Sequence, residues 1–363
     1  MKIQRRKFLK SAASGAMLVS ALGVNPLFGR KTDEKLGVAL VGLGYYSTDL
    51  LAPALQLTEE CELRGIVTGS PEKIPVWQEK YAIRDSNVYN YENMHQIANN
   101  DDIDVVYIVL PPSMHSEYSI IAAEAGKHVW CEKPMAKTVE ECQAIIDACN
   151  RNNVYLSIGY RMQHEPNTRR IMKWAKTQPY GSIENVLARA GYRESRKGHW
   201  KLDREMGGGA MYDMGVYPLN AARYSTGLEP VSVSARYEYT RPDLFNEVEE
   251  IAHFTLNFPK GIVANCTVSF AAGLNELRVT CSDGWYELQP FQAYNGIQGA
   301  ASDGTRLDAR IPNQQARQMD DDALAIKTSS QVMVPGEEGL RDIRIVEAIH
   351  RSARNGSSLV TIE

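Results

Sequence analysis

The segment Gly42-Leu43-Gly44-Tyr45-Tyr46-Ser47 has the glycine spacing of a phosphate-binding loop, GxGxx[G/A], with Ser in the last place. It directly follows an apolar run, residues 36–41. In such a loop the first glycine permits a tight turn, the second lets the backbone approach a pyrophosphate, and the next helix supplies amide donors. Its position between a strand and a helix predicts a dinucleotide site formed by Gly42, Gly44 and Tyr45.

The end of a second apolar run, residues 62–68, indicates which dinucleotide binds. NAD sites carry an acidic residue there to hold the ribose 2′-hydroxyl, whereas this sequence has Thr68, followed by Lys73. A carboxylate would repel a 2′-phosphate, while hydroxyls and an ammonium would attract it. The pattern favours NADP over NAD, with the alternative that Lys73 is an ordinary solvated side chain.

The first half of the chain alternates short β-rich runs with helical patterns, which predicts βαβ units and a parallel sheet. One helix is well defined, because Thr138 and Glu141 form a capping box at its start. An apolar stripe at helical spacing follows. The expected strands are 36–41, 62–68, 104–110, 128–131 and 154–158, and the stripe consists of Val139, Cys142, Ile145, Ile146 and Cys149.

After Gly181 the pattern changes to long alternating strands, with Asp283-Gly284 as a hairpin signal. A last helix at about 337–354 ends at Asn355-Gly356. We therefore expect an α/β Rossmann domain followed by an α+β domain with a large, mainly antiparallel open sheet. The strands expected in this second sheet are 182–192, 231–239, 252–258, 261–271 and 276–288.

Composition and charge exclude several classes of protein. With 363 residues the chain is long enough for two domains. The 40 Lys and Arg against 44 Asp and Glu give a net charge of −4, which favours neither nucleic acid nor an anionic membrane as partner. The six cysteines form no CxxC pattern, so we expect core thiols. His115, His164 and His199 lack metal-ligand spacing, and we assign no metal.

Further segments extend the pattern. They are Pro111-Pro112-Ser-Met-His115, Glu132-Lys133-Pro134, Gly159-Tyr-Arg161, the run from Trp200 to Gly209 that contains Arg204 and three glycines, Asp213-Met-Gly-Val-Tyr217, and 335–342. In this order they resemble the glucose-fructose oxidoreductase / inositol dehydrogenase / rhizopine catabolism family (Gfo/Idh/MocA), and within it the glucose-fructose oxidoreductase branch most closely. The resemblance covers nearly the whole chain after Asp33.

The resemblance implies hydride transfer between a sugar or polyol carbon and a nicotinamide. It places Lys133 beside the nicotinamide and the reacting hydroxyl, and Tyr217 where many relatives carry an acid/base His. Asp213 would orient the substrate or the Tyr–Lys pair, unless it only caps a helix. The implied cofactor contacts beyond the glycine loop are Pro111, His115, Glu132, Lys133, Arg161 and Trp200, and the implied substrate contacts are Arg161, Arg204 and Tyr217.

Oxidation of a carbinol needs a proton acceptor as the hydride leaves. A free Tyr has a pKa near 10, so bringing Tyr217 toward neutrality requires about three pKa units, or ~4 kcal/mol, of preferential stabilisation of the phenolate. The Lys133 ammonium can supply part of it. The alternative is that Tyr217 is only a packing aromatic.

The first 29 residues carry Arg5-Arg6 before an uncharged stretch and resemble a twin-arginine (Tat) signal peptide. We expect export to the periplasm by the Tat machinery, with a membrane anchor if the signal is not cleaved. Residues 33–158 would form the dinucleotide-binding domain. Residues 159–363 would form the sheet domain for substrate binding and homo-oligomerisation, as a dimer or tetramer. The glucose-fructose branch has a long arm before its first strand, and here only Arg30 to Lys35 intervene.

Export has a consequence for mechanism, because the periplasm maintains no pool of NADP to replace a released cofactor. We expect a tightly bound nicotinamide that oxidises one sugar and reduces another. The alternative is a redox-neutral NAD(P)-dependent glycoside hydrolase or epimerase. A third reading is a catalytically silent sugar-binding protein, against which the intact set of Lys133, Asp213 and Tyr217 argues.

Overall fold

The computed structural model describes residues 34–362, and the chain from Lys35 onward forms one compact unit. The predicted signal peptide, residues 1–29, and most of the segment before the first strand lie outside the described residues. Within the described range, none of the helices combines the length and the apolar character that a membrane span requires.

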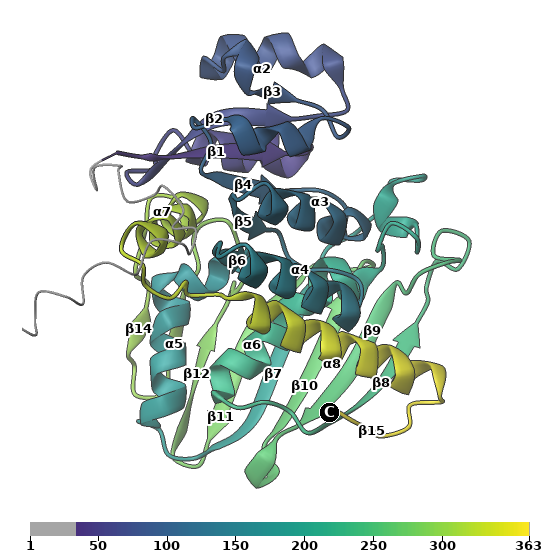
Figure 1. Ribbon diagram of the computed structural model, residues 1–363. Helices are drawn as coiled ribbons and strands as arrows, with labels where there is room; N and C mark the ends of the chain where they lie inside the picture. Colours follow the sequence, from purple (N-terminus) through teal and green to yellow (C-terminus); the bar gives the residue numbers. More distant parts are fainter. Residues whose placement is uncertain (1–33, 363) are drawn as a thin grey trace, which may run out of the picture. The chain divides into compact units, whose positions relative to one another are not determined.

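The first sheet has six parallel strands in the order β3-β2-β1-β4-β5-β6, the arrangement of a Rossmann domain (Figure 1). All five expected strands are present. The sixth, β3, was missed because two residues carry no periodicity. The strands are β1 (Leu36–Val41), β2 (Cys61–Val67), β3 (Val88–Tyr89), β4 (Val105–Ile108), β5 (His128–Cys131) and β6 (Leu156–Ile158).

The helices of this half follow the sequence signals. The capping box is formed as predicted, with Thr138 and Glu141 each bonding the other's backbone amide at the start of α4. The apolar stripe of α4 faces the core, where only Val139 is partly exposed. The helices are α1 (Ala52–Ala54), α2 (Ile74–Tyr81), α3 (Pro112–Glu124) and α4 (Val139–Arg151), with short 3₁₀ and π-helical turns between them.

The second sheet has nine strands in the order β14-β13-β12-β11-β7-β10-β9-β8-β15. Only β7 and β10 are parallel neighbours, so the sheet is mainly antiparallel as expected. The strands are β7 (Ile183–Gly191), β8 (Ser232–Glu238), β9 (Ile251–Asn257), β10 (Val263–Ser269), β11 (Leu274–Cys281), β12 (Gly284–Leu288), β13 (Gly299–Ala301), β14 (Arg306–Leu307) and β15 (Val360–Thr361).

The predicted hairpin turn needs a correction of one residue. Cys281 pairs with Gly284, so the two-residue loop is Ser282-Asp283 and the glycine already belongs to β12. Gly284 lies close against the Ser302 side chain of the neighbouring loop. Close packing within the sheet, and not turn geometry, therefore accounts for this glycine.

Helices α5 (Pro166–Thr177), α6 (Val216–Thr226) and α8 (Gly336–Arg354) lie on one face of the nine-stranded sheet (Figure 1). Helix α8 matches the predicted last helix. Helix α7 (Gln314–Lys327) was not predicted, and it packs Met319 and Ala323 against the Rossmann sheet, in a cluster with Val38 and Tyr107. The second half of the chain thereby covers one face of the first.

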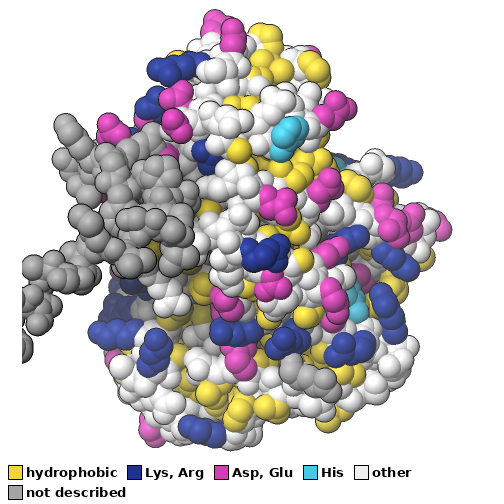
Figure 2. Space-filling view, in the orientation of Figure 1, with side chains coloured by type: hydrophobic (Ala, Val, Ile, Leu, Met, Phe, Trp, Pro, Cys, Tyr) yellow, Lys and Arg dark blue, Asp and Glu magenta, His cyan; other side chains and the backbone are white. Residues whose placement is uncertain are grey.

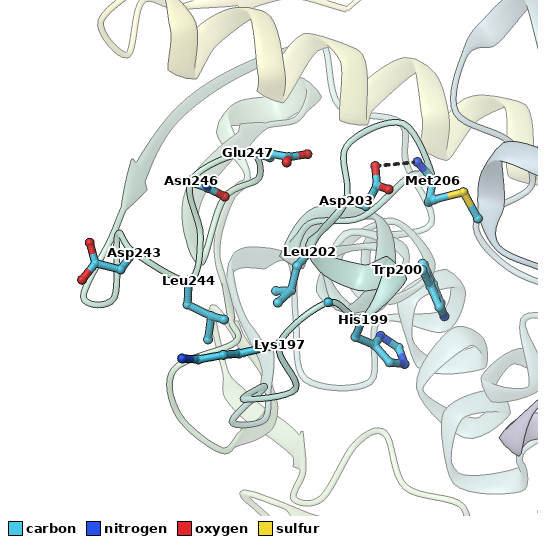
Figure 3. Close-up of a pocket in the computed structure, with 11 residues that line it drawn as sticks. Lys197, His199, Trp200, Leu202, Asp203, Met206, Asp243, Leu244, Asn246 and Glu247 are labelled. Atoms are coloured by element: carbon cyan, nitrogen blue, oxygen red, sulfur yellow. Dashed lines mark hydrogen bonds between the residues drawn. The ribbon is translucent and has the colours of Figure 1, made fainter.

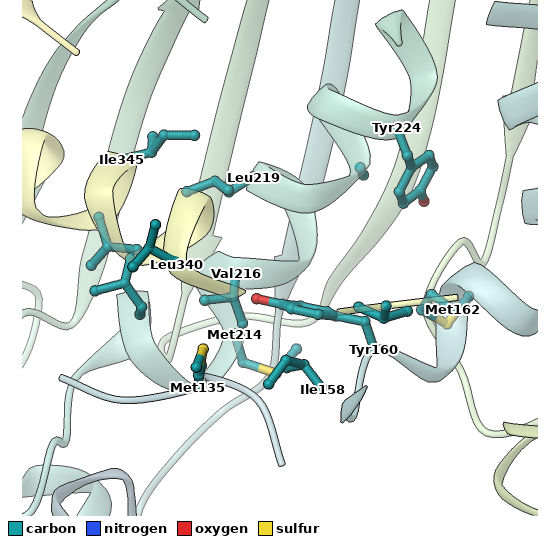
Figure 4. Close-up of a cluster of buried hydrophobic side chains, with 14 of the residues drawn as sticks. Met135, Ile158, Tyr160, Met162, Met214, Val216, Leu219, Tyr224, Leu340 and Ile345 are labelled. Atoms are coloured by element: carbon teal, nitrogen blue, oxygen red, sulfur yellow. The ribbon is translucent and has the colours of Figure 1, made fainter. Parts of the chain in front are cut away.

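A continuous core joins the two sheets. Figure 4 shows Met214, Val216 and Leu219 around the start of α6 beside Ile158 at the end of β6 and Leu340 of α8. All six cysteines are free and buried, as expected for core thiols. On the face drawn in Figure 2, side chains of both charge signs are interspersed, in line with the small net charge.

Candidate active site

The glycine loop after β1 has the geometry of a pyrophosphate cradle. Gly42 has φ of +90°, and a Cβ there would lie 2.5 Å from the carbonyl oxygen of Val109, so both conformation and space require glycine. At Gly44 no other atom lies within 4 Å of where a Cβ would be, which leaves the backbone open to an approaching phosphate. The Ser47 hydroxyl donates to the Gly42 carbonyl at 2.5 Å and closes the turn. Tyr45 is 65% exposed beside it.

The predicted 2′-phosphate residues lie next to this loop. Lys73 donates from Nζ to the carbonyl of Leu43 at 2.8 Å, which brings its ammonium to the fingerprint across 30 residues of chain. Thr68 is buried, and its hydroxyl accepts the Ser70 amide at 3.0 Å. Within the described residues the tip of β2 thus presents Thr68 where NAD-specific sites hold a carboxylate, and Lys73 follows in the next turn.

The residues predicted to carry the reaction, Lys133, Asp213 and Tyr217, lie together in the structure; we call them the reaction group. Lys133, directly after β5, donates from Nζ to the main-chain oxygen of Asp213 at 2.7 Å, and this nitrogen lies 4.6 Å from the centre of the Tyr217 ring. Burial alone would lower the pKa of Lys133, but attraction to Tyr217, Asp213 and Glu132 outweighs it, and the pKa is raised. The side chain is therefore an ammonium positioned to stabilise negative charge on oxygen.

The Asp213 carboxylate has hydrogen-bond partners that the sequence did not predict. Its carboxylate accepts Lys201 Nζ at 2.7 Å and the Tyr192 hydroxyl at 3.0 Å. Burial would raise its pKa, yet Lys201 and Lys133 lower it, so Asp213 is ionised. Asp213 orients Lys133 through its backbone oxygen, while its side chain holds Lys201. Lys201 stands between Trp200 and Leu202 in a family-like segment, a signal that could have drawn attention to it.

A second polar group lies behind Lys133. Buried Glu132 accepts the Tyr107 hydroxyl at 2.7 Å, and Gln318 of α7 donates to the same hydroxyl at 3.3 Å. Burial raises the pKa of Glu132 despite the hydrogen bond from Tyr107 and the charge of Lys133. Glu132 therefore shapes the electrostatics around Lys133 from the Rossmann side.

Arg161 is buried at the junction of the two halves. Its Nη1 donates to Gln314 Oε1 at 2.6 Å and to the Ala293 carbonyl at 3.0 Å. Its guanidinium lies 4.8 Å from the Tyr294 ring centre and 5.8 Å from that of Tyr217. The structure thus brings Arg161 to the Tyr217 group as predicted. No sequence pattern pointed to Tyr294 or Gln314, which reach the site through tertiary packing.

His115 and Pro111 support the site from α3. The two ring nitrogens of His115 lie 2.8 Å from the Pro134 carbonyl oxygen and 2.7 Å from that of Leu110. Burial lowers the pKa of this imidazole. The Pro111 carbonyl accepts the Met114 amide at 2.9 Å at the start of the helix. As placed, His115 ties the loop after β4 to the loop carrying Lys133.

Trp200 and Arg204 belong to the same segment as Lys201 but contact different groups. The Trp200 ring centre is 5.7 Å from Lys201 Nζ, and the Arg204 guanidinium binds the main-chain oxygen of Glu247. Trp200 lines a cavity of about 630 Å³ between residues 197–206 and 243–247 (Figure 3). Among the described residues, no contact joins Arg204 to Tyr217. Trp200, which lines this cavity, also contacts Lys201, the partner of Asp213.

Metal ligation finds no support among residues 34–362, where no group of three or more His, Cys, Asp or Glu side chains could hold an ion. The groups that do gather are the Lys133 ammonium, the Tyr217 phenol and the separate carboxyl groups of Asp213 and Glu132. This set can polarise a hydroxyl and accept its proton during hydride transfer.

Two family models match the sequence. Residues 36–160 match the Gfo/Idh/MocA oxidoreductase family with its NAD-binding Rossmann fold, and residues 168–287 match the C-terminal domain of the same family.

Individual relatives match over the same length. The crystal structure of an aldose-aldose oxidoreductase from Caulobacter crescentus, complexed with glycerol, is 38% identical and superposes with a TM-score of 0.87, covering 90% of this chain and 100% of that one. An NADP⁺-dependent D-xylose 1-dehydrogenase from Haloarcula marismortui is 29% identical over 90% of this chain and 94% of its own. A D-glucoside 3-dehydrogenase from Escherichia coli is 24% identical over 90% and 97%.

Proposed function

The chain belongs to the Gfo/Idh/MocA oxidoreductase family, and from that premise we propose that it transfers a hydride between the CH–OH group of a sugar and the nicotinamide of NADP. The observation that carries the proposal is the Lys133 ammonium, hydrogen-bonded to the Asp213 backbone at 2.7 Å and lying 4.6 Å from the Tyr217 ring centre. The NADP-dependent xylose dehydrogenase and the aldose-aldose oxidoreductase among the relatives support it.

The chemistry assigns a task to each side chain. Tyr217 takes the proton of the sugar hydroxyl as the hydride leaves the carbon, and it returns a proton in the reverse direction. Lys133, kept charged by its neighbours, stabilises the phenolate and the developing alkoxide. NADP, when bound, accepts the hydride, and the open backbone at Gly44 together with Lys73 would hold its phosphates.

We further propose that the protein is exported by the twin-arginine pathway with its cofactor bound and recycles that cofactor in place, reducing a second sugar. The name of the Caulobacter relative, an aldose-aldose oxidoreductase, agrees with such an exchange. A homo-oligomer built on the open sheet belongs to the same proposal. Fractionation of cells producing the full chain tests the export, and light scattering tests the assembly.

The test of function begins with denaturing the purified protein and identifying the released nucleotide, which should be NADP. An aldose such as D-xylose should then reduce the bound cofactor once, as a single burst of nicotinamide absorbance. Addition of a second aldose, or of a ketose, should reoxidise it and give parallel-line ping-pong kinetics.

Each other outcome has a distinct meaning. Steady turnover only with free NADP⁺ would identify an ordinary dehydrogenase that releases its cofactor. Release of an aglycone from a glycoside with no net redox change would favour the hydrolase alternative. No reduction by any aldose, with NADP bound, would contradict the proposal.

A further inference from the structure

Glu249 lies beneath the loop that leads into the helix carrying Asp213 and Tyr217. It is buried, with 6% of its surface exposed, and it stands just before β9. Its carboxylate accepts the backbone amide of Met211 at 2.8 Å, and its main-chain oxygen accepts that of Ala210 at 3.2 Å. Met211 opens the π-helical turn Met211–Gly215, which continues directly into α6. Glu249 thus satisfies amides that helix starts leave without partners.

The last of the three consecutive glycines before this helix packs against Glu249. Gly209 has φ of +109°, and any Cβ there would collide with Glu249 Oε1. The same loop is tied to the other side of the site, because the Gly209 amide donates to the Lys201 carbonyl at 2.9 Å and the Gly208 amide to that of Asp203 at 2.8 Å. Glu249, the glycines and Lys201 form one connected support under Asp213.

No basic side chain forms an ion pair with Glu249 within the described part of the chain. The cations that face it are Arg354 of α8 and Arg204, both acting at longer range. The phenols that face it, Tyr212, Tyr237 and Tyr239, have pKa values raised chiefly by their own burial, so they stay neutral.

The one imidazole in this neighbourhood is that of His350, which contacts the Tyr212 and Tyr237 rings. Burial and Arg354 lower its pKa to about 4, so it also stays neutral. Burial raises the pKa of Glu249 itself to about 7. It is therefore the group of this cluster whose charge changes near neutral pH.

We propose that Glu249 is a positioning residue for the hydride-transfer reaction, whose negative charge at the start of the Met211–Thr226 helix holds Asp213 and Tyr217 in register with Lys133. An anion at a helix N-terminus is favourable, and its loss weakens the first turn. This inference rests on the proposed function for its kinetic consequences, while its structural part stands alone. Protonation of Glu249 loosens the support, so hydride transfer slows as the pH falls through neutrality.

Glu249→Gln is the sharpest test, because glutamine keeps the size and an acceptor oxygen but carries no charge at any pH. The ratio of wild-type to variant kcat, measured with D-xylose and a second aldose on the bound NADP, should rise with pH around a midpoint of about 7. The expected rise is roughly threefold to tenfold, the effect of a charge at a helix N-terminus. The amount of NADP that copurifies with the protein should stay unchanged, since the glycine loop after β1 is a separate part of the site.

The matched control is Glu250→Gln, the same chemical change one residue away. Glu250 is buried and paired with Arg241 at 2.7 Å. Its burial would raise its pKa, but Arg241 and backbone amides lower it, so it does not titrate near neutral pH. This variant should lose stability without acquiring a pH-dependent kcat ratio. A flat ratio for Glu249→Gln would overturn the proposal.

Two measurements need no substrate and so separate this inference from the proposed function. Hydrogen exchange of residues 209–217, corrected for the intrinsic rate, should be faster at pH 6 than at pH 8 in the wild type and independent of pH in Glu249→Gln. The hydrogen bond from the Met211 amide lowers the pKa of the buried Glu249 carboxyl, so protonation favours loss of that bond alone but opposes global unfolding, which exposes the carboxyl to water. The Tm of Glu249→Gln relative to wild type should therefore increase between pH 4.5 and about 7 and then level off. If protection of 209–217 does not respond to pH, Glu249 is a packing residue only.

Discussion

The cofactor loop and the reaction group are built in different ways. Gly42, Gly44 and Lys73 lie within about 30 residues of chain, and backbone geometry does most of the positioning there. Lys133 and Tyr217 come from separate halves and contact each other directly. The backbone oxygen of Asp213 holds Lys133, and its carboxylate holds Lys201. The cofactor loop therefore depends on backbone conformation within one segment, whereas the group around Lys133 depends on contacts between residues far apart in the chain.

Substitutions of Lys133 and Tyr217 should have the largest effect on kcat. Tyr217→Phe removes the proton acceptor and should lower kcat roughly 10²–10⁴-fold. Lys133→Met removes the ammonium and should cost a similar factor. Both variants should still bind NADPH, which fluorescence titration would measure. A Tyr217→Phe enzyme that keeps most of its kcat would disprove the acid/base assignment.

Lys201→Met tests whether the indirect support matters. The substitution leaves the buried Asp213 carboxylate with Tyr192 as its remaining side-chain partner among the described residues, so the pKa of Asp213 should rise and Lys133 should lose its alignment. We expect kcat to fall roughly 10- to 100-fold, equivalent to about 1.4–2.8 kcal/mol. Lys173→Met, on the exposed side of α5, is the control. Equal kcat values for the two variants would remove Lys201 from the site.

Lys73→Ala tests the cofactor loop and its preference for NADP over NAD. Because this ammonium lies near the protein surface, its contact with a 2′-phosphate should be worth about 1 kcal/mol or less. The Kd for NADP⁺ should rise roughly twofold to fivefold, and the Kd for NAD⁺ should not change. Lys80→Ala on α2 controls for general charge, since Lys80 lies over the Tyr81 ring instead. An equal loss for both nucleotides would show that Lys73 does not read the 2′-phosphate.

Most of the fold could be predicted because its signals are local. The Thr138–Glu141 capping box, the alternating runs and the Asn355-Gly356 stop define their elements within a few residues. Helix α7 escaped prediction although the Asn313 side chain accepts the Ala316 amide at its start, because its buried face mixes apolar Met319 with polar residues such as Gln318 and Asp322. Only the Rossmann sheet against which it packs makes that face an interior one.

The same distinction between local sequence signals and tertiary packing applies to the residues of the candidate site. The glycine spacing after the first strand indicated Gly42, because a tight turn there requires glycine, whereas Lys133 and Tyr217 were indicated by the resemblance to the family. Tertiary structure decided that Asp213 serves Lys133 through its backbone, that Lys201 is its counter-ion and that Glu249 lies under Gly209. Such pairings join residues far apart in the chain, and because sequence spacing carries no information about distance across a folded core, only the packed structure could reveal them.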